Sequence, residues 1–169
     1  MFNKRYQKAF TLLEVIVAIT VLTIAVGGSF ALIQQTMVAA SLNQSKLTAY
    51  YLAQEGIELV RNIRDSNWLE QRANPTVLWK EGLGAGDWEA DFNDSGLVQP
   101  FVGEGRFLNV GSEGFYTYSG ESSTPFKRKI TIAEMGSNAL EATVQVLWSE
   151  RGRDHQVEVK EHIYNWYGY

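Results

Sequence analysis

The most constraining feature of the sequence is an apolar stretch near its beginning, from Phe10 to Ile33. These 24 residues contain a single charged side chain, Glu14. As an α-helix the stretch would be about 36 Å long, which exceeds the roughly 30 Å of a bilayer core. A carboxylate in such a segment costs about 2.5 kcal/mol or more and usually has a partner and a function. We therefore predict a transmembrane helix over 10–33 and expect Glu14 to be functional.

A short polar segment with three basic residues, Lys4, Arg5 and Lys8, precedes the apolar stretch. Basic residues next to a membrane helix stay on the cytoplasmic side. The next charged residue after Glu14 is Lys46. We therefore expect a single pass through the cytoplasmic membrane, with the N-terminus in the cytoplasm and the body of the chain outside it.

This arrangement resembles the N-terminus of type IV prepilins and of the related type II secretion pseudopilins. The matching residues are the basic leader over 1–9, the small residue Ala9 and the sequence Phe10-Thr11-Leu12-Leu13-Glu14-Val15. The family motif has glycine where this chain has Ala9. The resemblance implies cleavage after Ala9 by a prepilin peptidase, N-methylation of Phe10 and assembly into a filament. It also implies that Glu14 pairs with the amino end of a neighbouring subunit.

Two other interpretations of this region stay open. Ser29-Phe30-Ala31 resembles a signal-peptidase site, which would make residues 1–31 a secretory signal peptide. Alternatively, the apolar stretch is an uncleaved signal anchor. Neither interpretation explains why an acid occupies position 14, and the apolar run is long for the core of a signal peptide.

The composition narrows the possible functions. Of the 169 residues, 45% are hydrophobic, which is enough for a packed core outside the membrane. The net charge of −4 becomes −7 without the three leader cations, so we expect no nucleic-acid binding. The chain has no cysteine, which excludes disulfides and thiolate metal sites.

The helix is expected to continue beyond the membrane and to cover 10–64. There is no proline before Pro75. Apolar or small residues recur at spacings of four and three, which is typical of a helix packed along one side. These residues are Val38, Leu42, Ser45, Ala49, Leu52, Gly56, Leu59 and Ile63.

The remaining residues, 65–169, are predicted to form a globular β domain. Its first part, 65–125, is expected to be a glycine-rich loop region between helix and sheet, with short strands and a hairpin turn at Gly111–Gly114. Its second part, 126–166, shows alternating apolar residues and short links, which predict an antiparallel meander. The predicted strands are 76–79, 106–110, 115–118, 126–133, 140–149 and 156–164.

These elements predict an α+β fold of the type IV pilin kind, with a long N-terminal helix packed on a C-terminal antiparallel β-sheet. The helical region from Ala49 to Asn62 and the closing meander with Trp148 and Asn165-Trp166 resemble PilV-type minor pilins in particular. Filament assembly through the apolar helix is what this resemblance implies.

Few residues suggest chemistry beyond assembly. Asp91, Asn93 and Ser95 are spaced like the first ligands of an EF-hand loop, but Val102 occupies the position of the bidentate acid. We interpret this segment as a polar turn, with calcium as a weak alternative. His155 and His162 lie on opposite faces of one predicted strand and do not form a metal site. The basic run 127–129 is interpreted as a charged strand start rather than a DNA contact. We find no catalytic residues and no cofactor motif.

We therefore expect a structural subunit, similar to a minor pilin, of a type IV pilus. Its expected partners are other pilin subunits, the prepilin peptidase, the pilus assembly platform and the cytoplasmic membrane, with no small-molecule substrate. A type II secretion pseudopilin is the alternative of the same class, and its final location would be a periplasmic pseudopilus rather than a cell-surface pilus. An anchored extracytoplasmic binding domain that does not polymerise is the alternative of another class.

Overall fold

The computed structural model describes residues 10–94, 96–97 and 99–166 of the chain. The chain comprises two units, residues 1–43 and 44–169. One helix, α1 (Leu12–Gln71), crosses the boundary between them. In the first unit, the described residues form the beginning of this helix, whereas the second unit contains its end together with all of the β-structure.

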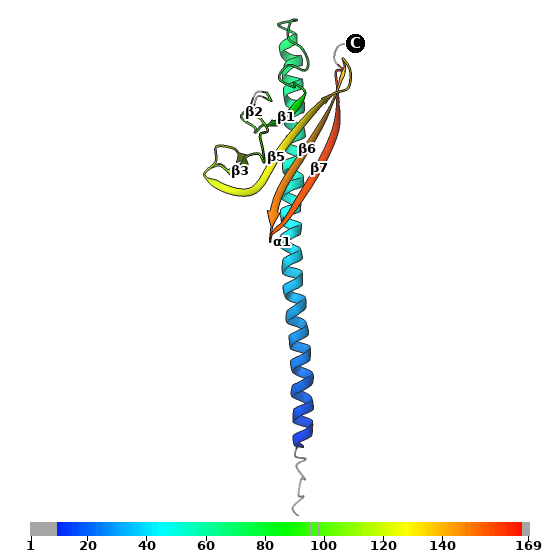
Figure 1. Cartoon of the computed structure of the whole chain (residues 1–169), viewed down its shortest axis with the longest axis vertical. Helices are drawn as coiled ribbons and strands as arrows, with labels where there is room; N and C mark the ends of the chain where they lie inside the picture. The colour runs from blue at the N-terminus through cyan, green and yellow to red at the C-terminus, as the bar shows by residue number, and fades with distance from the viewer. Residues whose placement is uncertain (1–9, 95, 98, 167–169) are drawn as a thin grey trace, which may run out of the picture. The chain divides into compact units, whose positions relative to one another are not determined.

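The second unit contains one antiparallel sheet built around β5, its longest strand (Figure 1). On one side β5 pairs with β6, which in turn pairs with β7. On its other side β5 pairs with β1 and with β3, which extend the sheet to β2 and β4. The strands are β1 (Gly86–Glu89), β2 (Gln99–Pro100), β3 (Phe107–Val110), β4 (Tyr116–Thr117), β5 (Ser122–Glu134), β6 (Ala139–Glu150) and β7 (Arg153–Tyr164).

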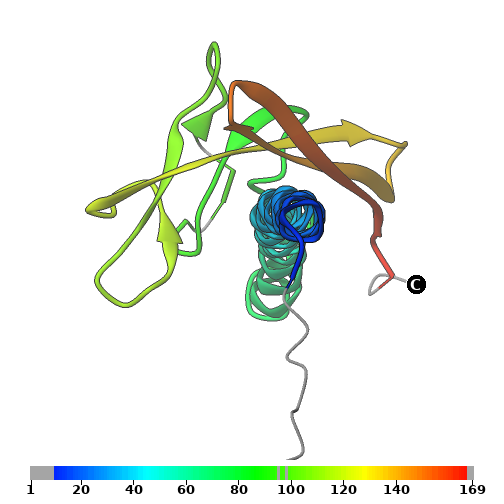
Figure 2. The same cartoon turned by 90° about the horizontal axis from the view of Figure 1, so that it is seen from below.

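The core of this unit lies between the sheet and the later turns of α1. Seen along the helix, the sheet curves over one side of it (Figure 2). The buried helix residues recur at helical spacing, and inward-facing residues of β5, β6 and β7 complete the core. The helix residues that are buried are Ala49, Leu52, Ala53, Gly56, Ile57, Val60, Ile63 and Trp68.

Gly56 allows the helix and the sheet to come close together. A Cβ atom at this position would lie 2.7 Å from Cγ1 of Val144, which is shorter than real contacts of this kind. Val144 is itself fully buried in the middle of β6. The glycine therefore sets the distance between the two layers, and any larger residue here would have to push them apart.

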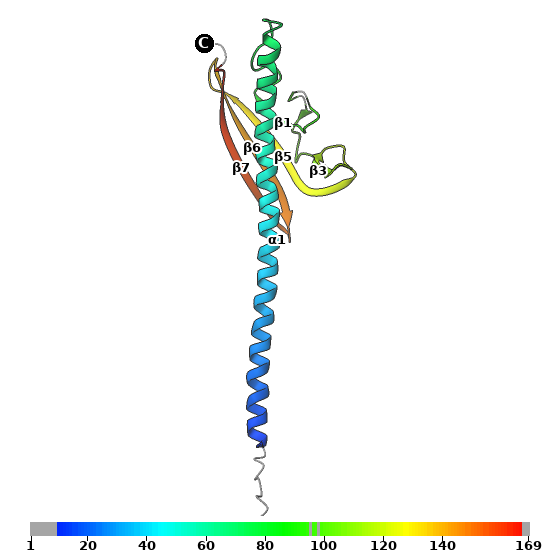
Figure 3. The same cartoon turned by 180° about the vertical axis from the view of Figure 1, so that it is seen from behind.

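The other side of the helix in this unit is not covered by the sheet (Figure 3). Leu47, Tyr50 and Tyr51 of this helix are exposed. Their spacings of three and four residues place Leu47 next to both tyrosines on the helix surface.

The structure confirms the expected α+β fold, the hairpin between β3 and β4, and the three-stranded meander. The helix, however, continues to Gln71 instead of ending at Arg64. Its last turns are held by Trp68, whose Nε1 donates to Asn165, and by Asn67, whose side chain donates to the backbone oxygens of Trp79 and Glu81.

Two predictions about strands are wrong. The segment 76–79 forms turns rather than a strand, although Val77 and Trp79 are buried. It follows Asn74-Pro75, and the Asn74 side chain accepts hydrogen bonds from Thr76, which favours a turn. The basic run 127–129 lies in the middle of β5 rather than at its start, because β5 begins at Ser122 to pair with β3.

Candidate assembly site

The first helical turn brings together the residues of the N-terminal motif. Helix α1 begins at Leu12, directly after Thr11, and Glu14 lies in its first turn. The backbone N–H of Glu14 donates to the Thr11 hydroxyl at 3.3 Å, and that of Val15 donates to the Thr11 carbonyl at 3.3 Å. Thr11 is therefore the N-cap, and the acid three residues later completes the sequence pattern of a capping box.

The capping role of Thr11 was not expected from the sequence, although the spacing Thr-x-x-Glu provides the signal. The acid also lies where the helix dipole is positive, which stabilises a carboxylate. Phe10 directly precedes the cap and is exposed. Ala9 and the three basic residues before it lie outside the described residues. Of the two residues at the expected cleavage site, the structure therefore describes Phe10.

Residues 12–33 present apolar side chains all round the helix. Within α1, an 18-residue window has a mean hydropathy of 2.4, and none of it is buried. The part of the chain that the structure describes contains one helix long and apolar enough to cross a membrane. An apolar surface of this extent requires lipid or other helices around it. It fits a membrane-anchored precursor.

The N-terminal motif is the part of the chain that matches a known family model. Residues 4–30 match the model of the prokaryotic N-terminal methylation motif, the signal of type IV pilins and pseudopilins. The chain therefore carries the N-terminal signal of type IV pilins and pseudopilins. No curated protein and no solved structure matches it. The match supports the pilin and pseudopilin family as a whole rather than the PilV-type subgroup, and it points to a structural subunit.

Among its described residues, the globular unit contains three buried charged residues, Glu89, Asp91 and Arg128, of which Glu89 pairs with the exposed Arg106 and Arg128 pairs with the partly exposed Glu55. Arg128 is 0% exposed, because it faces the core from β5 between Phe126 and Ile130. Its Nη1 lies 3.2 Å from the Leu52 oxygen and 3.1 Å from Oε1 of Glu55, and its Nη2 donates to the Ala90 oxygen at 2.6 Å. The guanidinium of Arg128 thus connects β5 to α1 and to the segment after β1 through hydrogen bonds and an ion pair.

This burial corrects the interpretation of the basic run 127–129. Lys127 and Lys129 point to the outer face of the sheet, whereas Arg128 points into the core, since side chains alternate along a strand. Arg128 is therefore inaccessible to any partner. The alternation Phe126, Arg128, Ile130 was present in the sequence and was the signal for an inward-facing arginine.

Asp91 organises the loop that follows β1. Its Oδ2 accepts hydrogen bonds from the Thr117 hydroxyl at 2.6 Å and from the Tyr118 backbone at 3.0 Å, and its Oδ1 accepts one from the Asn93 backbone at 3.0 Å. Burial raises the pKa of Asp91, but these hydrogen bonds and the charge of Arg128 outweigh it, so the pKa lies below its usual value.

Of the three residues considered for calcium, the structure describes Asp91 and Asn93, and both take part in hydrogen bonds within the protein. The Asp91 carboxylate is directed at Thr117 and Tyr118, and Asn93 contributes its backbone to Asp91. Ser95 lies outside the described residues. Among the residues that are described, no group of three or more histidine and acidic side chains could hold a metal ion.

The two histidines have separate environments on β7. The His155 ring stacks on Trp148 with 5.3 Å between ring centroids. His162 lies 3.2 Å from a carboxylate oxygen of Glu141, which also pairs with Lys160. The register places His155 opposite Trp148 on the inner face and His162 opposite Glu141 on the outer face, as their spacing indicates.

We expect the D91N variant to lose about 1–3 kcal/mol of unfolding free energy at neutral pH, because a buried acceptor of three hydrogen bonds loses its charge. The folded-state pKa is depressed, so this stabilisation is present above the unfolded-state pKa of about 3.9 and is lost as pH falls through the folded-state value. Denaturant unfolding of both proteins should show the difference narrowing as the solution is acidified below about pH 4.

The matched control is D154N, which changes an exposed aspartate and should leave stability within about 0.5 kcal/mol of the wild type. A D91N deficit of equal size at neutral and acidic pH would contradict this role of the carboxylate.

Proposed function

We propose that this chain is a structural, minor pilin-like subunit of a type IV pilus. The observation that carries the proposal is the methylation motif at 4–30, combined with an acid in the first turn of an otherwise uncharged apolar helix. In this proposal the leader is cut after Ala9, the new amino end at Phe10 is N-methylated, and the apolar helix enters the filament core.

Glu14 would make the specific contact in that core. A carboxylate among apolar helices is stabilised only by a cationic or hydrogen-bonding partner, and the amino end created at Phe10 of a neighbouring subunit is such a cation. Because Thr11 caps the helix, Phe10 lies just outside it. The amino group created at Phe10 would therefore be free to contact a neighbouring subunit. The pairing would fix the depth at which each new subunit enters.

The proposal also covers location and partners. The basic leader would hold the N-terminus of the precursor in the cytoplasm, with residues 44–169 outside the membrane. The partners would be the prepilin peptidase, the assembly platform and other pilin subunits, and the chain would not be an enzyme. A type II secretion pseudopilin has the same N-terminal signal, and this second candidate is favoured by the same motif.

Fractionation of cells that carry their own assembly genes distinguishes these candidates. We expect an antibody to the chain to detect it in filaments sheared from the cell surface, in smaller amounts than the major subunit. A pseudopilin would be absent from sheared filaments and required for protein secretion instead. A chain found only as a membrane monomer while filaments form would contradict assembly altogether.

A further inference from the structure

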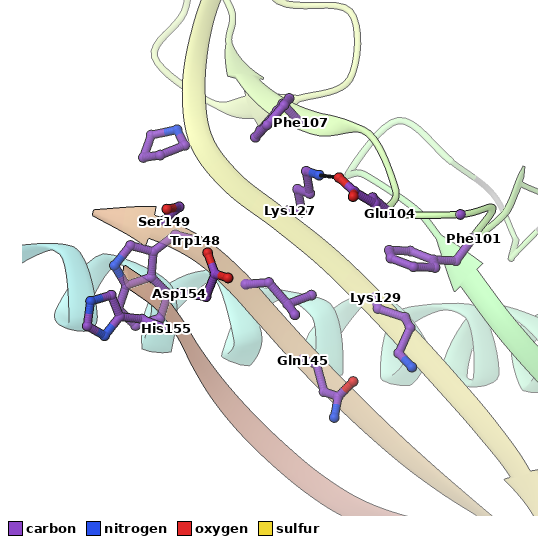
Figure 4. Close-up of a pocket in the computed structure, with 13 residues that line it drawn as sticks. Phe101, Glu104, Phe107, Lys127, Lys129, Gln145, Trp148, Ser149, Asp154 and His155 are labelled. Carbon is purple, nitrogen blue, oxygen red and sulfur yellow. Dashed lines mark hydrogen bonds and ion pairs between the residues drawn. The ribbon is translucent and has the colours of Figure 1, made fainter. Parts of the chain in front are cut away.

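The outer face of the sheet, opposite the helix, carries a pocket of about 570 Å³ (Figure 4). This volume lies within the range of roughly 300–1,000 Å³ that is usual for small-molecule sites. Its floor is formed by outward-facing side chains of β5 and β6, in which Lys127 lies opposite Leu147 and Lys129 lies opposite Gln145. One wall is the segment 101–107.

This wall segment is fixed at both of its ends. The backbone N–H of Phe101 donates to the Asp87 oxygen at 2.9 Å. Arg106 donates to the buried carboxylate of Glu89 through its backbone N–H at 2.6 Å and its Nε at 2.5 Å. A wall anchored to a buried acid and to β1 keeps its shape in the absence of a ligand.

Gly105 gives the wall its shape. Its φ of 74° lies in the left-handed region, and a Cβ atom here would lie only 2.2 Å from the Phe101 ring. Glycine therefore lets the Phe101 ring fold back over the loop and line the pocket. Phe107, at the other end of the wall, is 49% exposed and lies beside Lys127, whose Nζ is 4.5 Å from its ring centroid.

The pocket is lined by equal numbers of lysines and acidic residues. Lys127 and Lys129 are opposed by Glu104 and Asp154, and the Nζ of Lys127 lies 3.2 Å from Oε2 of Glu104. A balanced lining offers no net attraction for a polyanion such as nucleic acid. It does offer donors and acceptors side by side, since the amide of Gln145 supplies both, with one of its two Nε2 hydrogens donated to Glu158 at 2.7 Å.

The backbone of the floor is not available to a ligand. Both β5 and β6 are paired on each side, so a peptide strand has no free edge to join within the pocket. Recognition must therefore use side chains, and those that line the pocket include four aromatic rings, two amines, an amide and two acids.

From this combination we infer that the pocket binds a sugar, whose hydroxyls each donate and accept hydrogen bonds and whose C–H face packs on Phe101 and Phe107. Hydroxyl groups need both kinds of partner, which the lysines, Gln145 and the acids provide. The negative face of an aromatic ring attracts the polarised C–H groups of a sugar ring. The sugar is a ligand that is bound and released unchanged.

The test uses the full chain in lipid nanodiscs and saturation-transfer NMR with methyl glycosides of glucose, galactose, N-acetylglucosamine and glucuronic acid as probes. We expect saturation transfer to the ring protons of at least one glycoside. The F107A variant should bind that glycoside at least about fivefold more weakly, as should Q145A, which changes an outer-face side chain that the core does not use.

The matched control is F92A, because Phe92 is 48% exposed, like Phe107, but does not line the pocket. It should bind as the wild type does. Absence of transfer to all four glycosides, or transfer that both F107A and Q145A leave unchanged, would overturn the assignment.

Crosslinking of an E104C variant to another subunit in filaments would show that a subunit fills the pocket, which would also overturn it. Since binding is measured on the monomer, the result does not depend on filament assembly.

Discussion

The E14V variant should reach the membrane normally and yet be at least tenfold depleted from filaments. Valine removes a charge that costs about 2.5 kcal/mol or more in a bilayer, so insertion should not suffer. In the filament core, however, the amino end of the neighbouring subunit would lose its counter-charge, and breaking a buried ion pair costs about 3–5 kcal/mol. The measurement is the ratio of chain in sheared filaments to chain in membranes.

Two further variants separate charge from polarity. E14Q keeps the shape of the side chain without its charge, and it should fail as E14V does. T20V removes a hydroxyl from the same apolar helix, where Thr20 donates only to the Ile16 oxygen of its own helix, and it should assemble normally. Incorporation of E14V at the wild-type level would mean that Glu14 only stabilises the N-terminal end of its own helix and makes no contact needed for assembly.

The R128Q variant should lose about 3 kcal/mol of unfolding free energy, which corresponds to a decrease in Tm of about 10 °C for a domain of this size. Glutamine is shorter and uncharged, and it cannot reach the Leu52 oxygen, the Ala90 oxygen and Glu55 together. Buried carbonyl groups would then lack a donor. Thermal unfolding of the full chain in detergent, followed by tryptophan fluorescence, reports on this unit because all five tryptophans lie in it.

The control is K129Q, one residue further along the same strand. Lys129 faces outward, and its ammonium lies 3.7 Å from Asp87 in a pair open to solvent, so its loss should cost no more than about 1 kcal/mol. Equal destabilisation by R128Q and K129Q would show that the buried guanidinium has no special role in joining the helix, β1 and β5.

The sequence was most informative where a pattern repeats. The apolar run with its single acid predicted a helix long and apolar enough to cross a membrane, because charge and length act directly on membrane insertion. The alternation in Ala142, Val144 and Val146 predicted β6, because a sheet with one buried face requires a period of two. The helix stripe predicted the packed side of α1 from Ala49 to Ile63.

Where contacts between distant segments decide the structure, the sequence was less informative. The sequence of β1 has no alternation of apolar and polar residues. The strand forms between β5 and β2, where Trp88 lies opposite Ile130 of β5 and Pro100 of β2. The inward position of Arg128 conflicts with the usual exposure of arginine, and it depends on partners 38 and 76 residues away. The outer pocket joins segment 101–107 to residues of β5, β6 and β7 that come later in the chain, which no local pattern reveals.

Intact-mass analysis and N-terminal sequencing of the chain isolated from its own cell membranes test the central claim most directly. A prepilin-like subunit should begin at Phe10 and be heavier than the unmodified sequence by one methyl group. A chain that begins at Leu32 would be a secreted domain released from a signal peptide. A chain that still begins at Met1 would be an uncleaved anchor, and either of these results would contradict the proposed assembly.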